Sequence, residues 1–149
     1  SYAAHMAEST GGAANGHCVA HAIGARYHVV HGHSAIMVIP ALIRHHAEAS
    51  AENIAKLAEI FAVPKTGTAK EVADYVADAV LDFYKSFGFE NCKKTLEANG
   101  FDDDVDQFTE NLIPAILDDF KSRNWVPPID GEENRENLVN VCHMIYNEK

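Results

Sequence analysis

The sequence predicts an all-α fold, a bundle of helices in one domain, on three observations. Hydrophobic residues recur at spacings of three and four along most of the chain, with little alternation at a period of two, as amphipathic helices require. Gly, Pro and Asn-Gly breakers divide the chain into short helical segments. The length of 149 residues, with 47% hydrophobic and 23% charged residues, suits one globular domain with one core.

The middle of the chain predicts two helices after a start rich in Gly and Ala. In residues 35–46 the isoleucines recur at three and four, and Pro40 inside this segment predicts a kinked or broken helix. In residues 51–62 the apolar side chains fall on one face until Pro64 stops the segment.

The best-defined helix begins after Thr68. Thr68 and Glu71 form a capping-box pattern, in which each side chain accepts a hydrogen bond from a backbone N–H at the helix start. Gly88 is the expected end of this helix. The apolar residues predicted for its buried face are Val72, Tyr75, Val76, Ala79, Val80, Phe83 and Phe87.

Three further helices are predicted over residues 90–98, 103–121 and 132–146. Asn99-Gly100 ends the first of them, and the acidic residues 102–104 suit the start of the second, where the helix dipole favours negative charge. The polar residues Asp118 and Asp119 are expected on its solvated face. Pro127 and Pro128 exclude a regular helix between the last two segments, where Trp125 is expected to pin the loop to the core.

The charge balance excludes some classes of partner. The net charge is -10, which repels phosphate backbones and anionic lipid, so we expect neither nucleic acid nor membrane as a partner. No apolar run approaches the roughly 20 residues that span a bilayer. Three widely spaced cysteines fit free thiols in a reducing, cytoplasmic compartment. We interpret residues 1–6 as a cloning remnant and start, and residues 7–149 as one helical domain.

Histidine is the compositional outlier, because five of the nine histidines fall within residues 17–33. His17 and His21 are four apart and share one face of a helix. On one straight helix His31 would lie roughly 21 Å from His17 at about 1.5 Å per residue. Gly24 and the pair Val29-Val30 allow the helix to end and the chain to fold back, which would return His31 to His17.

If the chain folds back so that His31 lies near His17, the two side chains could bind one metal ion. Two or three imidazoles with an open coordination position suit catalytic Zn(II) or Fe(II). A spaced histidine pair taken alone is more often a surface or core feature, so the spacing leaves both interpretations open. His28 and His33 could belong to either, whereas adjacent His45 and His46 are expected to be solvated.

Residues 16–40 resemble the signature of the iron-containing (group III) alcohol dehydrogenases. That signature runs His-x-x-x-His-x-x-Gly, then six residues to His-Gly, then an apolar run that ends in Leu-Pro. The corresponding positions here are His17, His21, Gly24, His31, Gly32 and Ile39-Pro40. Further along, Leu96, Gly100 and Asn124 resemble the end of the same C-terminal domain.

The resemblance implies an all-helical C-terminal domain like that of dehydroquinate synthase-type enzymes. It implies that His17 and His31 are two ligands of Fe(II) or Zn(II), and that His21 beside the metal contacts substrate or relays a proton. The family interconverts alcohols and aldehydes with NAD(P), which binds an N-terminal domain that has no counterpart in this sequence. The family's other two metal ligands, an Asp and a His on an upstream helix, have no counterpart in this sequence either.

Three interpretations follow. The first is the metal- and substrate-binding half of an iron-type alcohol dehydrogenase, incomplete as a lone chain and completed by a complementary N-terminal domain. The second takes Met6 as a true start and the protein as a free-standing truncated descendant with lyase, isomerase or cyclase activity, its metal site completed by His28, His33 or another residue. The third is a pseudoenzyme that serves as a binding module. The last two would expose an apolar face unless the protein forms a homodimer.

Overall fold

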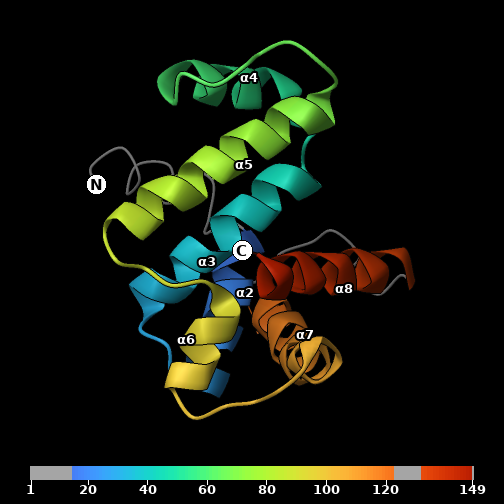
Figure 1. Ribbon diagram of the computed structural model, residues 1–149. Helices are drawn as coiled ribbons and strands as arrows, with labels where there is room; N and C mark the ends of the chain where they lie inside the picture. The colour runs from blue at the N-terminus through green and yellow to red at the C-terminus, as the bar shows by residue number, and fades with distance from the viewer. Residues whose placement is uncertain (1–14, 123–131, 149) are drawn as a thin grey trace.

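The protein is all-helical, as the sequence predicts. The computed structural model describes residues 15–122 and 132–148, and in these residues it has seven helices and no strand (Figure 1). The helices are α2 (Asn15–Tyr27), α3 (His31–His45), α4 (Ala51–Ile60), α5 (Ala69–Ser86), α6 (Cys92–Ala98), α7 (Val105–Ser122) and α8 (Glu132–Asn147). None of the helices in this part of the chain is long and apolar enough to cross a membrane.

The predicted capping box forms at the start of α5. The hydroxyl of Thr68 accepts from the backbone N–H of Glu71 at 3.2 Å, and the Glu71 carboxylate accepts from the backbone N–H of Thr68 at 2.7 Å. Gly88, just past the end of the helix, adopts a φ of 80°, a conformation that costs glycine little. These local signals explain why both ends of α5 lie where the sequence predicts them.

The main hydrophobic core lies between α2, α3, α7 and α8, with α6 against its lower side (Figure 1). α7 contributes the stripe predicted from its spacing, and Phe108, Leu112, Ile116 and Phe120 are all buried. A second, smaller core lies between α4 and α5 and includes Ile54, Ala58, Val72 and Val76. α3 links the two, because Met37, Val38 and Ala41 pack in the main core while Ile43 packs against the smaller one.

A polar network fixes the end of α2 against the start of α7. The buried Tyr27 hydroxyl donates to the Asp103 carboxylate at 2.8 Å, and the Asn111 amide donates to the same carboxylate oxygen at 2.7 Å. The Asn99 side chain donates to the Tyr27 carbonyl at 3.0 Å. Because a buried hydroxyl must be paired, this network specifies where α2 sits.

Some expectations from the sequence are wrong in detail. α3 is continuous through Pro40, so of the two alternatives for this segment the broken helix is wrong, and α3 begins at His31, four residues before the expected start. Tyr75, Phe83 and Phe87 are 43%, 51% and 67% exposed, although their spacing on α5 predicted burial. Trp125 and its loop lie outside the described residues, so that prediction stays a prediction.

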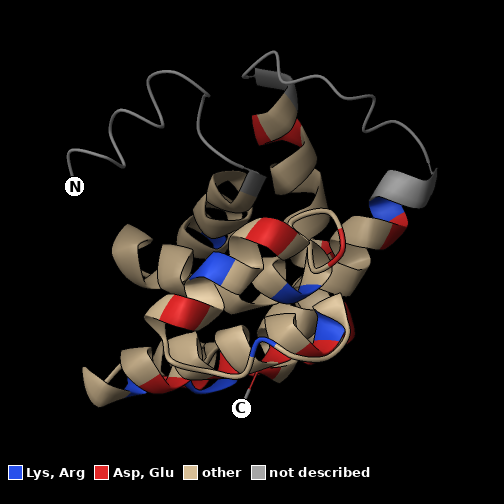
Figure 2. Cartoon of the chain, turned by 90° about the horizontal axis from the view of Figure 1, so that it is seen from above, with Lys and Arg blue, Asp and Glu red and all other residues tan. Residues whose placement is uncertain are grey.

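Acidic and basic side chains are interspersed over the helices. Figure 2 shows no broad basic face in its view of the described residues. One charged group is more concentrated: Arg44 of α3 pairs with Asp74 at 3.1 Å and Asp78 at 2.6 Å, both on α5, and with Glu148 after α8. This cluster ties three helices together on the side where the C-terminus lies.

Candidate functional site

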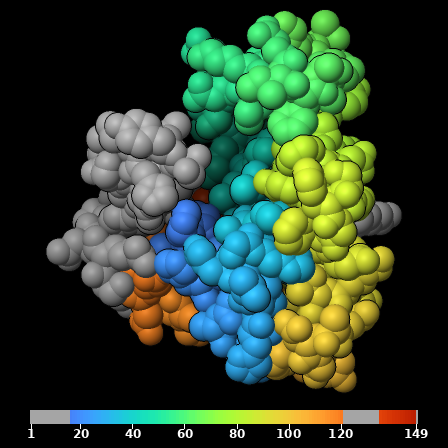
Figure 3. Space-filling view, turned by 90° about the vertical axis from the view of Figure 1, so that its left-hand side faces the viewer, coloured from blue at the N-terminus to red at the C-terminus, as the bar shows by residue number. Residues whose placement is uncertain are grey.

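The candidate site is the corner between α2 and α3. His17 and His21 lie on the first turns of α2, and His31 is the first residue of α3. Figure 3 shows this corner, in blue and light blue, at the molecular surface between α6 and α7. Gly24 marks the close approach of the two helices, because a Cβ placed there would lie 3.1 Å from the Val29 carbonyl and 3.6 Å from the Ser34 hydroxyl.

The chain reverses direction in three residues. α2 continues past Gly24, where the sequence allowed it to end, and stops at Tyr27. His28 then adopts a φ of 56°, in the left-handed region that non-glycine residues seldom enter. At the start of α3 the Ser34 backbone N–H donates to the Val30 carbonyl at 3.0 Å, and the Ser34 hydroxyl donates to the His31 carbonyl at 2.9 Å. This turn carries His31 back toward the start of α2.

The three imidazole rings converge, in the arrangement that the sequence suggested. The ring centroids of His17 and His31 lie 5.5 Å apart, those of His21 and His31 5.0 Å, and those of His17 and His21 5.9 Å. The fold therefore brings together His17 and His31, which are fourteen positions apart in the sequence.

A carboxylate from a distant helix completes the cluster. Asp119 of α7 lies 2.8 Å from Nδ1 of His21, and the side chains are 20% and 37% exposed. A carboxylate accepts hydrogen bonds only, so Nδ1 is the donor. The sequence placed Asp119 on a solvated face, which is wrong. The signal that could have found it is helical phase, since Asp119 follows buried Ile116 by three residues and precedes buried Phe120.

The other histidines have different neighbours. His33 donates from Nε2 to the Glu90 carbonyl at 3.2 Å, and the His28 ring lies 5.9 Å from that of Phe101. His45 is half-buried rather than solvated, and burial, followed by the charge of His46, lowers its pKa below the ordinary value. The three cysteines are buried free thiols, as expected.

The donor set suits a metal only in part. A ligating imidazole nitrogen lies about 2.0–2.1 Å from Zn(II), so two rings at a tetrahedral angle have centroids roughly 5.2 Å apart. The 5.5 Å between His17 and His31 is close to this separation. Within residues 15–122 and 132–148, however, no group of three or more His, Cys, Asp or Glu side chains is arranged to hold a metal ion. His17 and His31 can thus supply two ligands of a larger set.

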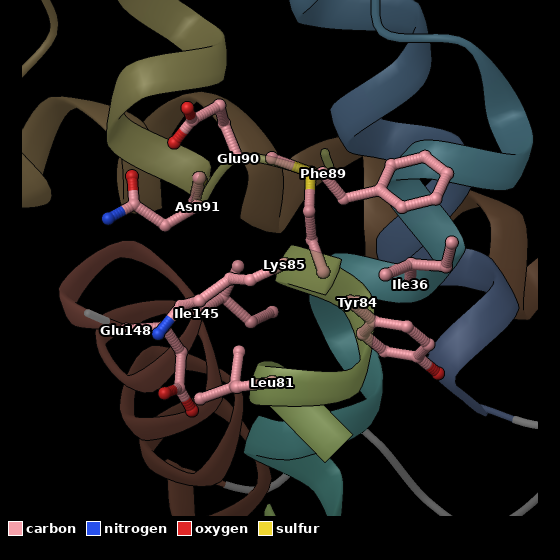
Figure 4. Close-up of a pocket in the computed structure, with 11 residues that line it drawn as sticks. Ile36, Leu81, Tyr84, Lys85, Phe89, Glu90, Asn91, Ile145 and Glu148 are labelled. Carbon is pink, nitrogen blue, oxygen red and sulfur yellow. The ribbon is translucent and has the colours of Figure 1, made fainter. Parts of the chain in front are cut away.

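Two pockets lined by described residues lie away from this corner, and neither of the two is lined by these histidines. The pocket in Figure 4 is enclosed by residues of α3, α5 and α8 and of the segment before α6, among them Ile36, Leu81 and Ile145. Its cavity volume is about 30 Å³, room for one or two water molecules. A neighbouring, more open pocket of about 320 Å³ is lined by the Arg44 cluster.

The fold defines an all-helical domain in which three histidine rings converge where α2 and α3 meet. The family model described as "Fe-containing alcohol dehydrogenase family, C-terminal" matches residues 1–127. The chain belongs to this family and represents its C-terminal domain. No curated protein and no solved structure gave a significant match.

Proposed function

We propose that this domain is the metal- and substrate-binding half of an NAD(P)-dependent oxidoreductase that interconverts small alcohols and aldehydes. The observation that carries the proposal is the convergence of His17, His21 and His31 in a domain of this family. Family membership alone indicates iron or a similar metal. The three rings provide a place in this chain where such a metal and the reacting oxygen would lie.

In this proposal His17 and His31 hold a divalent iron or zinc together with donors from outside the described residues. The bound metal would act as a Lewis acid toward the substrate oxygen. His21 is close enough to both rings to reach a substrate beside them, and its role is to exchange a proton with the alcohol oxygen. NAD(P) is the hydride carrier and requires a nucleotide-binding domain, the complementary partner proposed here.

Metal titration of the purified chain tests the ligand assignment. Co(II) is the probe, since its visible absorption reports nitrogen coordination, and Fe(II) and Zn(II) follow by competition. We expect weak binding of one Co(II) that is reduced at least tenfold in His17→Ala and in His31→Ala. His143→Ala removes a half-buried histidine of α8 and is the matched control, with no expected change. Equal affinity in wild type and His17→Ala would refute the assignment.

Activity then separates the proposed function from a free-standing one. The chain is mixed with the N-terminal nucleotide-binding domain of another family member, and NADH formation is followed with a panel of small primary alcohols. Turnover that requires both domains and NAD(P) supports the proposal. Turnover by the lone chain without nicotinamide would refute it and favour a lyase, isomerase or cyclase. Sedimentation of the lone chain shows whether it forms a homodimer.

A further inference from the structure

We call His17, His21 and His31, where α2 meets α3, the histidine corner. The hydrogen bond from His21 to Asp119 of α7 assigns a role to a residue outside the family signature. We propose that Asp119 is a positioning residue that holds His21 in the Nδ1–H tautomer, so that Nε2 of the neutral ring carries the lone pair and acts as the base. The value of this tautomer for catalysis rests on the proposed function. The tautomer itself does not, and it can be measured on the chain alone.

The geometry supports a directed contact rather than a chance surface pair. The Nδ1 to Oδ2 distance is 2.8 Å, in the range of charge-assisted hydrogen bonds. Asp119 is only 20% exposed, on the border of the stripe that α7 buries against α2. The two residues are 98 positions apart, so the contact exists only when α7 is packed in place.

The chemistry of imidazole gives the contact its consequence. In a neutral ring one nitrogen is a donor and the other an acceptor, and the partner of one nitrogen decides which is which. With Nδ1–H donated to Asp119, Nε2 is the acceptor. A proton from an alcohol oxygen can be taken only by a nitrogen with a lone pair, so the opposite tautomer would place the lone pair on the wrong nitrogen.

The ring packing makes the same bond an orientational restraint. The His21 ring is tilted 38° to that of His31 and 77° to that of His17. At 37% exposure the packing encloses His21 only in part. The Asp119 bond therefore restrains the rotation of the His21 ring.

Nitrogen-15 NMR of the histidine rings tests the proposal. Spectra are recorded at about pH 9, well above the ordinary pKa of imidazole, and long-range proton to nitrogen correlations report which nitrogen of His21 is protonated. We expect mainly the Nδ1–H tautomer in the wild-type chain. In Asp119→Ala the ratio of tautomers should shift about tenfold toward Nε2–H, as loss of one charge-assisted bond implies. Asp119→Asn keeps an acceptor oxygen, so we expect the wild-type tautomer to remain the main form. The change in the tautomer ratio should be smaller than in Asp119→Ala.

Asp118→Ala is the matched control, because Asp118 is an exposed carboxylate one residue away on the same helix. It should leave the His21 signals unchanged. A wild-type His21 in the Nε2–H form would overturn the proposal even if Asp119→Ala failed to fold. An unchanged tautomer in a folded Asp119→Ala variant would overturn it as well.

Co(II) titration of the same variants separates this inference from the proposed function. A positioning role predicts that Asp119→Ala binds Co(II) within about threefold of wild type, whereas loss of a ligand would weaken binding at least tenfold. A loss of tenfold or more would place Asp119 or His21 at the metal, since loss of an outer-shell partner of a ligating histidine has an effect of this size, and it would overturn the role assigned here. Insensitivity of Co(II) binding to His17→Ala refutes only the proposed function and leaves the tautomer result standing.

Discussion

Replacing Tyr27 with Phe should destabilise the protein by removing one hydroxyl from the network that fixes α2. Tyr27 is fully buried, and its hydroxyl donates to Asp103 at 2.8 Å. Burial raises the pKa of this hydroxyl, against a smaller lowering by the Asn111 hydrogen bond and with a further raising effect of Asp103, so it stays a donor across the usual pH range. The ring itself is retained in Tyr27→Phe, so its packing on Phe101 and Phe108 is kept.

The size of the expected loss of stability depends on which hydrogen bonds Asp103 loses and which it keeps in Tyr27→Phe. A hydrogen bond to a charged group contributes about 1.5–3 kcal/mol. Asp103 is half-buried and keeps the Asn111 bond at 2.7 Å, so the lower end applies. We expect a loss of about 1.5 kcal/mol in the free energy of unfolding, which for a chain of this length lowers Tm by about 3–6 °C.

Urea denaturation followed by circular dichroism measures this loss. Tyr75→Phe is the matched control, because Tyr75 is 43% exposed and lies on α5, away from the network. Its effect should stay within about 0.5 kcal/mol. If both variants have the same stability within that margin, the Tyr27 hydroxyl does not hold α2 in place and the reasoning fails.

Two further substitutions test the N-cap of α5 and the charged cluster around Arg44. Thr68→Ala should cost about 1 kcal/mol by removing the cap of α5; no change in urea denaturation would argue against the cap. Because the Thr68 backbone N–H, then its hydroxyl, lowers the pKa of Glu71, the stabilisation from Glu71 is present above its ordinary pKa and lost as pH falls through the lowered one. Arg44→Ala should cost about 1–3 kcal/mol at neutral pH, because it leaves Glu148 buried beside two other carboxylates, whereas Lys85→Ala, at an exposed pair, should change little. Burial raises the pKa of Glu148 even with Arg44 present; a protonated Glu148 costs less to bury, so the loss in Arg44→Ala should shrink as pH falls through that raised pKa, and a loss that grows instead would contradict this account.

Local signals in the sequence predicted most of the fold. The start of α5 and the ends of α5 and α6 are set by residues close to the caps, namely Thr68, Gly88 and Gly100, so they can be read along the chain. The exposure of Tyr75, Phe83 and Phe87 could not be predicted in this way. A broad apolar stripe shows that one side of a helix is buried, but which edge of the stripe is covered depends on the neighbours that the fold supplies.

The histidine corner was predicted in part. The return of His31 to His17 followed from the breakers between them: α2 continues past Gly24, but the reversal over residues 28–30 includes the predicted pair Val29-Val30. The left-handed backbone of His28 gives no signal in residue type. Helical phase could have placed Asp119 at the border of the buried stripe, but its partner His21 lies 98 residues away and no spacing rule identifies that partner.

The two separate cores make this domain suited to carrying a fused label. α3 starts at the histidine corner and ends against the α4 and α5 pair, so it is a direct structural link between the two cores. The segment of residues 62–67 that joins α4 to α5 is almost entirely exposed and lies at the end of the molecule remote from α2 (Figure 1). A fluorophore or short affinity peptide inserted there should report on the protein without altering the histidine corner.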